Sequence, residues 1–292
     1  MAPVSQLLFN GIIAGAIYAL VAAGFSLIYS TNKFIHFAHG STVAFGGYFL
    51  YFFFSELGVN FGFSVLFAVI LAAGLGVAMN YAVYKPIRKK QGSPVIMLIA
   101  SVALLILLES LIIILFGASV KSIGFLEVSK GIEILGAIIT PLQIFIVGSS
   151  VVLFGSLFFL IKKTKIGKAM RAVADNKDVA EVLGISSEKI YLWTFIVGSA
   201  IAGIAGILIG MEQNLDPTMG TNLMIKGLAA AIIGGIGNVY AAVLGAFFLG
   251  IVENIGIWYL PSGYKDAIAF AILFLFLIIK PEGILGKRQR ET

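Results

Sequence analysis

Long apolar segments separated by short polar stretches dominate this chain of 292 residues. We predict eight full membrane spans, since a helical span takes about 20 mostly apolar residues. The spans cover residues 7–29, 38–54, 61–84, 95–116, 138–161, 191–210, 239–260 and 267–279, and a shorter apolar segment covers residues 223–233. No segment alternates as a membrane strand does, and only helices or closed barrels satisfy backbone groups in lipid. The pattern predicts an all-α polytopic membrane protein with eight or nine transmembrane helices, some of them short and broken.

The composition excludes most soluble classes of protein. Apolar residues make up 60% of the chain and charged residues only 12%, about half the charged share of soluble domains. A soluble enzyme, a nucleic-acid-binding protein and a disordered scaffold are excluded on that ground. With no Cys and only two His, the chain offers neither thiolate chemistry nor a His-rich metal site. We expect a single transmembrane domain over residues 1–292, without a metal or cofactor of its own.

Lys and Arg residues are distributed unevenly among the predicted loops. If the C-terminus is cytoplasmic and every segment crosses, sixteen lie inside, in groups at residues 33, 85–90, 162–189 and 280–290. Lys121, Lys130 and Lys265 lie outside, and Lys226 falls near a helix end and is left unassigned. The positive-inside rule then favours nine crossings and an external N-terminus. A segment 223–233 that turns back within the membrane would instead place the earlier basic loops outside.

The longest polar stretch, residues 162–190, is cytoplasmic in this topology. Its first half is typical of a short amphipathic helix. Thr164 is the expected N-cap, because a Thr side chain accepts a backbone N–H of the first helical turn. The apolar face of this helix would carry Ile166, Met170 and Val173.

A second short helix is predicted to follow in the same stretch. Asp175 and Asn176 end the first helix, Asp178 caps the second, and Gly184 supplies the residue just beyond its C-terminus. Helices this short are unstable alone and need a partner surface. We therefore favour a docking element for a cytoplasmic protein over a basic loop that lies on anionic lipid headgroups.

Glycine interrupts two of the apolar segments. Gly46 and Gly47 fall inside the second span, and Gly234, Gly235 and Gly237 end the short segment. Close helix packing through small residues explains most of the 34 glycines. Shortened, Gly-interrupted segments in both halves of a transporter also mark a substrate path at the membrane midplane. Residues 39–51 and 226–238, which cross in opposite directions in this topology, are our candidate path segments, related by inversion.

Polar side chains at membrane depth are further candidates. Asn32, His36 and His39 lie at the cytoplasmic end of the second span, where they either line the path or cap an interface. Glu109 and Glu253 lie mid-span, where a lone carboxylate is costly and faces protein or water. Each is either a coupling-ion site or a hydrogen-bonded packing residue, and the lack of a connecting chain of acids and His favours packing.

Motifs of enzymes that bind nucleotides or hydrolyse substrates are absent from the sequence. There is no GxxxxGK[ST] phosphate loop, no GxSxG elbow and no HExxH. The chain is therefore not expected to be an enzyme. Uphill transport would draw on an ion gradient or on a separate ATPase.

Several groups of residues along the whole chain form a set of motifs that match one family of transport proteins. The opening matches at GAIYALVA (15–22), SLIY (26–29), Asn32 and FAHG (37–40). The polar loop matches at Gly167, MRAVA (170–174), Ala180 and LGI (183–185). The last third matches at residues 230–237, Gly245, Gly250 and KPEGILG (280–286). Taken together, these motifs resemble branched-chain amino acid ABC transporter permeases of the LivH type. Urea-type permeases are similar over the same motifs.

The resemblance implies an inner-membrane subunit of an ABC importer. Its partners would be a sister permease, two cytoplasmic ATPases that bind the ATP, an external solute-binding protein and membrane lipid, with no nucleic acid. Residues 164–185 would insert into a groove of an ATPase. The coupling residues that this resemblance implies are Thr164, Gly167, Met170, Arg171, Ala172, Asp175, Ala180 and Gly184.

Import of branched-chain amino acids is the function we expect. A urea or amide importer subunit is the close alternative. Two other classes stay open, namely an ion-coupled secondary transporter that uses Glu109 and Glu253, and a passive channel. Neither of these explains a structured basic loop as well as ATPase docking does.

Overall fold

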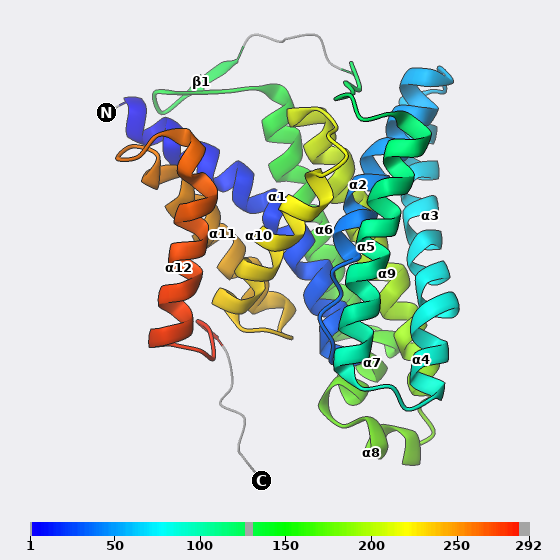
Figure 1. Cartoon of the computed structure of the whole chain (residues 1–292). Coiled ribbons are helices and arrows are strands. Elements are labelled where there is room, and N and C mark those ends of the chain that lie inside the picture. Colours follow the sequence, from blue (N-terminus) through cyan, green and yellow to red (C-terminus); the bar gives the residue numbers. More distant parts are fainter. Residues whose placement is uncertain (1, 126–130, 286–292) are drawn as a thin grey trace. The chain divides into compact units, whose positions relative to one another are not determined.

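The computed structural model describes residues 2–125 and 131–285 and is predominantly helical (Figure 1). The helices are α1 (Ala2–Asn32), α2 (His39–Leu50), α3 (Phe61–Met79), α4 (Lys85–Lys89), α5 (Pro94–Phe116), α6 (Pro141–Lys163), α7 (Lys165–Asp175), α8 (Lys177–Val182), α9 (Ser187–Gln213), α10 (Met219–Gly234), α11 (Val239–Gly256) and α12 (Lys265–Ile279). Two π-helical turns, η1 (Tyr51–Glu56) and η2 (Asn80–Tyr84), continue α2 and α3, and a 3₁₀ turn, η3 (Ser262–Tyr264), precedes α12. Lys130 and the tail residues Lys287, Arg288 and Arg290, which entered the charge count, lie outside the described residues.

Six of the described helical segments are long and apolar enough to cross a membrane. They are Val4–Asn32, Phe61–Lys89, Pro94–Phe116, Pro141–Lys163, Ser187–Gln213 and Val239–Gly256. The predicted spans at 38–54 and 267–279 correspond to α2 with η1 and to α12, and the short segment at 223–233 corresponds to α10. The prediction of an all-α polytopic membrane protein is therefore confirmed.

One small β-hairpin departs from the helix-only prediction. Strands β1 (Ile132–Ile134) and β2 (Ala137–Ile139) pair antiparallel, with Ile132 opposite Ile139. The turn residues Leu135 and Gly136 have φ of 50° and 78°, as the two-residue turns of hairpins require. The fifth span was therefore predicted to begin three residues too early, because apolar Ile138 and Ile139 belong to the hairpin rather than to α6.

The start of α6 is fixed by its first polar residues. The N–H of Gln143 donates to Thr140 Oγ1 at 3.3 Å, and the N–H of Thr140 donates to Gln143 Oε1 at 3.0 Å. This reciprocal capping box satisfies two backbone donors that a helix start otherwise leaves unpaired. Pro141, the first helical residue, needs no such partner.

The chain divides into two compact units. Unit 1 comprises Met1–Ser26, Phe125–Val151 and Ile225–Thr292, and unit 2 comprises Leu27–Gly124 and Val152–Met224. Three of the four boundaries between the sequence segments fall inside helices, so that α1, α6 and α10 each contribute residues to both units. The single domain expected from the sequence stays a prediction.

Unit 2 is held together by close contacts of small residues, with α9 packed on α2 and α3. A methyl group added at Gly46 would collide with the backbone of Gly203, and one at Gly206 would collide with the carbonyl of Val43. One added at Gly203 would lie 2.5 Å from the Cβ of Ala72 on α3. Helices in lipid associate through such close backbone approach, because there is no hydrophobic force between them.

Unit 1 uses the same scheme, with α1 packed on α10 and α11. A methyl group at Gly11 would lie 2.7 Å from the Cα of Ile251, and one at Gly227 would lie 2.7 Å from a methyl carbon of Val21. In each unit a long helix therefore packs against one short and one longer helix. The inverted relation between the candidate path segments stays a prediction.

Candidate functional site: the α7–α8 loop

The polar loop folds into two helices at the end of unit 2 that also carries α4 (Figure 1). Thr164 lies in extended conformation between α6 and α7, and its Oγ1 accepts the N–H of Gly167 at 3.0 Å. The same hydroxyl donates to the carbonyl of Leu160 at 2.6 Å. The predicted N-cap at Thr164 is confirmed, and its second bond ties α7 to the last turn of α6.

Helix α7 is packed tightly against the rest of unit 2. Gly167 lies so close to α6 that a methyl group there would collide with the carbonyls of Leu160 and Ile161. Met170 and Val173 are buried, as the amphipathic pattern predicted, whereas Ile166 is only half-buried. Helix α7 contacts α9. The loop is therefore connected to this membrane helix by side-chain packing as well as by the covalent chain.

Helix α8 is capped at both ends, although its N-cap differs from the predicted one. Asn176, not Asp178, lies in extended conformation before the helix, and its Oδ1 accepts the N–H of Val179 at 3.1 Å. Asp178 lies inside the first turn, where a negative charge still favours the helix N-terminus. Both residues are good caps, and the prediction was wrong because the helix begins at Lys177.

Gly184 ends α8 as predicted. Its φ is +83°, the left-handed region that glycine adopts without strain. The N–H of Gly184 donates to the carbonyl of Glu181, and the N–H of Ile185 donates to the carbonyl of Ala180, both at 2.9 Å. These two bonds form a Schellman motif, which closes the helix in a defined conformation.

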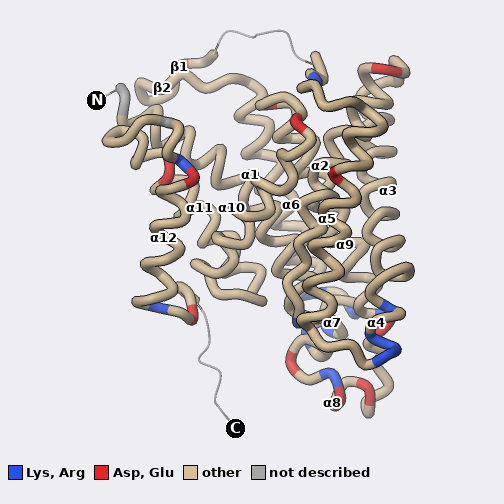
Figure 2. The backbone as a smooth tube through the Cα atoms, viewed as in Figure 1, with Lys and Arg blue, Asp and Glu red and all other residues tan. Residues whose placement is uncertain are grey.

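The outer face of α8 is apolar. Val182 and Leu183 are 88% and 73% exposed, and Val179 is 54% exposed, whereas Ala180 is buried beneath them. Figure 2 shows Lys and Arg residues, with Asp and Glu residues among them, along the backbone at this end of unit 2. Arg171 is exposed and Ala172 half-buried on α7, and Asp175 is exposed at its end. An apolar patch inside a charged, capped and rigid loop is typical of a protein-binding surface.

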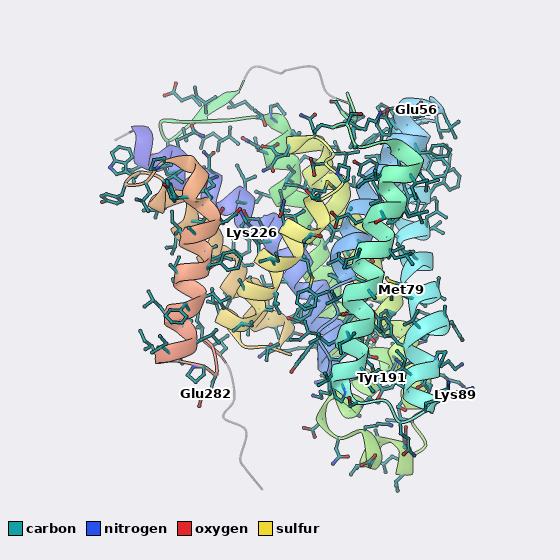
Figure 3. The ribbon with its side chains drawn as sticks, in the orientation of Figure 1. Glu56, Met79, Lys89, Tyr191, Lys226 and Glu282 are labelled. Carbon is teal, nitrogen blue, oxygen red and sulfur yellow. The ribbon has the colours of Figure 1, made fainter. Side chains whose placement is uncertain are left out.

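An ion pair braces the base of the loop. Arg88 of α4 makes two parallel hydrogen bonds to Glu188 in the first turn of α9, Nε to Oε1 and Nη2 to Oε2, each at 2.9 Å. Arg88 Nη2 also donates to Asn80 Oδ1 at 2.7 Å. The guanidinium lies 4.7 Å from the ring centroid of Tyr191. Figure 3 shows Tyr191 and Lys89 at this same end of unit 2.

The candidate path residues of unit 2 are buried among protein side chains. His36 and His39 are fully buried, and Tyr84 Oη lies 2.8 Å from His36 Nδ1. Asn32 donates to the carbonyl of Ile28 at 3.1 Å. Gly46 and Gly47, on α2, face α9: a methyl group at either would collide with that helix or the residues that follow it. Their part in a translocation path stays a prediction.

The candidate path residues of unit 1 form the turn after α10. Gly235 and Gly237 have φ of 129° and 84°, and Gly234 touches the backbone of Ala241. The chain after α12 returns to this turn, where the N–H of Ile284 donates to Ile233 O at 2.8 Å and that of Leu285 to Gly234 O at 2.9 Å. The glycines admit this close approach, and a role in the path again stays a prediction.

The two mid-span carboxylates have different surroundings. Glu109 is half-buried, and its Oε2 accepts the hydroxyl of Thr221 at 2.9 Å. Glu253 is fully buried and its Oε1 lies 2.8 Å from Lys226 Nζ and 3.4 Å from Tyr18 Oη. Lys226, labelled in Figure 3, also lies 3.0 Å from Asp266 Oδ1. Both carboxylates therefore have hydrogen-bond donors.

Comparison with known proteins identifies the family. The family model described as the branched-chain amino acid transport system / permease component matches residues 7–277. The chain belongs to this family. It is 30% identical to the high-affinity branched-chain amino acid transport system permease protein LivH of Escherichia coli (strain K12), over 98% of this chain and 96% of LivH.

Two further relatives have similar coverage. The permease protein BraD of the high-affinity branched-chain amino acid transport system of Pseudomonas aeruginosa is 33% identical over 98% of this chain and 97% of BraD. The probable branched-chain amino acid transport permease protein LivH of Methanocaldococcus jannaschii is 30% identical over 96% of this chain and 92% of that protein. The resemblance drawn from the sequence motifs is thus confirmed.

Two interactions of this permease were missed by the sequence analysis. Arg88 was treated only as one of the basic loop residues, and Lys226 was left unassigned. The partners of both are far away in the sequence, since Glu188 is 100 residues from Arg88 and Tyr18 is 208 residues from Lys226. One signal was present: Lys226 lies within a short apolar segment, where a buried cation needs a counter-charge.

Proposed function

We propose that this permease is the membrane subunit of an ABC importer for branched-chain amino acids, in which α8 docks on a cytoplasmic ATPase. Family membership and the whole-chain similarity to LivH and BraD support the solute class. The observation that carries the docking role is the exposed apolar face of α8, Val179, Val182 and Leu183, in a loop fixed at both ends. ATP would be bound by the partner ATPases, and this chain would bind no cofactor.

The packing of the loop supports a mechanical role. A force on α8 would reach α7 through the capped turn at Asn176, and then α9 through buried Met170 and Val173. Helix α9 is in turn packed on α2 without space for even a methyl group at Gly206. Such tight packing transmits displacement rather than absorbing it. ATP-driven closure of the ATPases would thereby move the helices of unit 2 and give alternating access.

The charges of unit 2 support the proposed orientation. Helix α4, which carries Lys85, Arg88 and Lys89 and is followed by Lys90, lies at the same end of unit 2 as α7 and α8 (Figure 2). The positive-inside rule would place this end in the cytoplasm. The N-terminus of the chain would then be external and the C-terminus cytoplasmic, in a plasma (inner) membrane.

The partner set follows from the importer class. Besides two ATPases, it would comprise a sister permease and an external solute-binding protein that selects the solute. The permease itself would then hold the amino acid only weakly. The ion pair of Glu253 with Lys226 also disfavours an ion-coupled transporter, because a carboxylate with a fixed counter-charge is a poor carrier of protons.

The docking role can be tested by introducing a charge on α8. Val182→Asp places a carboxylate in the proposed interface, where an uncompensated buried charge costs several kcal/mol, roughly 3–5. We expect the ATPase to be lost from the affinity-purified complex and solute uptake to cease. Leu135→Asp is the matched control, because Leu135 is 82% exposed on the turn of the β-hairpin. Retention of the ATPase by Val182→Asp would contradict the docking role.

A further inference from the structure

The end of unit 2 opposite to the α7–α8 loop contains an aromatic pocket of about 610 Å³. Figure 3 shows Glu56 at this end, with Lys89 and Tyr191 at the other. The pocket is lined by η1 and its neighbours, by one residue of α3 and by the end of α5. Its lining residues are Phe49, Tyr51, Phe52, Phe53, Glu56, Leu57, Leu71, Leu115, Phe116 and Lys121.

Two walls of this pocket are exposed apolar surfaces of helices long enough to cross a membrane. Leu71 of α3 and Leu115 of α5 are 41% and 60% exposed. Only 22% of an 18-residue apolar stretch in each of these two helices is buried in the chain, so most of each stretch is exposed on the surface of an apolar span. Because the pocket opens between two apolar spans, we infer that its occupant comes from the bilayer.

The mouth of the pocket carries one charge of each sign. Tyr51 Oη donates to Glu56 Oε1 at 2.5 Å, and Lys121 Nζ lies 6.0 Å from the centroid of the Tyr51 ring. Glu56 and Lys121 therefore flank the same tyrosine. Both lie where the apolar helices end, since α5 stops at Phe116 and η1 stops at Glu56. Aromatic and charged residues at this depth meet the headgroup layer of a membrane.

The geometry points to a binding site for a zwitterionic glycerophospholipid with a primary amine, as in phosphatidylethanolamine. One acyl chain lies in the aromatic pocket, Lys121 pairs with the phosphate, and Glu56 pairs with the ammonium group. An anionic lipid without an amine places its net charge against Glu56 and is disfavoured. The site depends on the membrane placement of unit 2 and is independent of ATPase docking.

Native mass spectrometry of the permease, purified with the subunits that accompany it, tests this site. The complex is placed in nanodiscs with equal amounts of phosphatidylethanolamine, phosphatidylcholine and phosphatidylglycerol, then extracted and its retained lipid identified. We expect one phosphatidylethanolamine to be retained. Lys121→Ala is expected to lower its retention about fivefold, the factor for one Lys–phosphate contact at a membrane surface.

Two more variants separate the pocket from nonspecific lipid. Leu71→Trp fills the pocket and is expected to abolish retention, whereas Leu66→Trp, also at an exposed position of α3, is expected to leave it unchanged. Glu56→Gln is expected to remove the preference for phosphatidylethanolamine over phosphatidylcholine. Equal retention in all variants, or preferential retention of phosphatidylglycerol, would overturn the proposal. Cross-linking of a protein subunit to a Cys introduced at position 71 would also overturn it, because a protein would then occupy the pocket.

Discussion

At the scale of single residues, Lys226 is a largely buried cation in an apolar segment, where a charge needs a partner. Its ammonium group lies 2.8 Å from the fully buried carboxylate of Glu253 and 3.0 Å from Asp266. The Tyr18 hydroxyl donates a hydrogen bond to Glu253 and accepts one from Lys226. A buried ion pair contributes little net stability over an apolar pair, but the loss of one partner leaves the other charge uncompensated. Lys226 thus joins α10 to α1, α11 and α12 within unit 1.

Replacing Lys226 by an apolar residue is expected to destabilise the permease strongly. Lys226→Met leaves Glu253 buried without a counter-charge, at a cost of about 3–5 kcal/mol. The melting temperature in detergent is expected to fall, and the double variant with Glu253→Gln is expected to recover most of the loss. Lys89→Met, at an exposed position, is the control. A double variant no more stable than Lys226→Met would show that charge compensation is not the role of Lys226.

Arg171 and Gly184 offer a test of the loop that leaves the membrane helices intact. Proline cannot adopt the positive φ of Gly184, and Arg171→Glu reverses an exposed charge on α7. We expect either substitution to abolish uptake while membrane insertion stays normal, as measured by solute accumulation and by the amount of chain in the membrane fraction. Normal uptake in both variants would refute the coupling role of these residues.

At the scale of elements, the sequence predicted helices best where local chemistry fixes both ends. Helix α5 was predicted at 95–116 and runs from Pro94 to Phe116, because Ser93 caps its start and Gly117, with φ of 84°, ends it. Helix α6 was predicted less well, since the apolar strand β2 precedes it without a polar break. The N-cap of α8 was assigned to the wrong one of two suitable residues, because the local sequence does not decide at which of them the helix begins.

From the sequence, close helix packing could be predicted, but the pairing of α9 with α2 could not. Small residues indicated close helix contacts, but not which helices meet. Gly206→Ala inserts a methyl group against the Val43 carbonyl, and overpacking of this sort costs about 1–3 kcal/mol. We expect a lower melting temperature and reduced uptake. Gly74→Ala on α3, where the added methyl group has open space, is the control, and equal effects of the two variants would contradict the packing account.

At the scale of the whole molecule, the apolar pattern was sufficient for the fold class, and the motifs were sufficient for the family. The long-range polar contacts were not predictable, because Arg88–Glu188 and Lys226–Glu253 depend on which helices become neighbours in the folded chain. A periodic pattern defines the buried face of one helix without naming its partner. The division into two units has the same origin: α1 and α9 each pack with helices distant in sequence.

The central claim is that α8 contacts an ATPase, and site-specific cross-linking tests it most directly. The chain has no native Cys, so Val182→Cys gives a single thiol for a photoactivatable cross-linker in intact membranes. Leu135→Cys is the control. We predict that an ATP-binding-cassette subunit, identified by mass spectrometry, is cross-linked at position 182 and not at position 135. Cross-linking at 182 to lipid alone, together with solute uptake by the isolated chain in liposomes, would contradict the account.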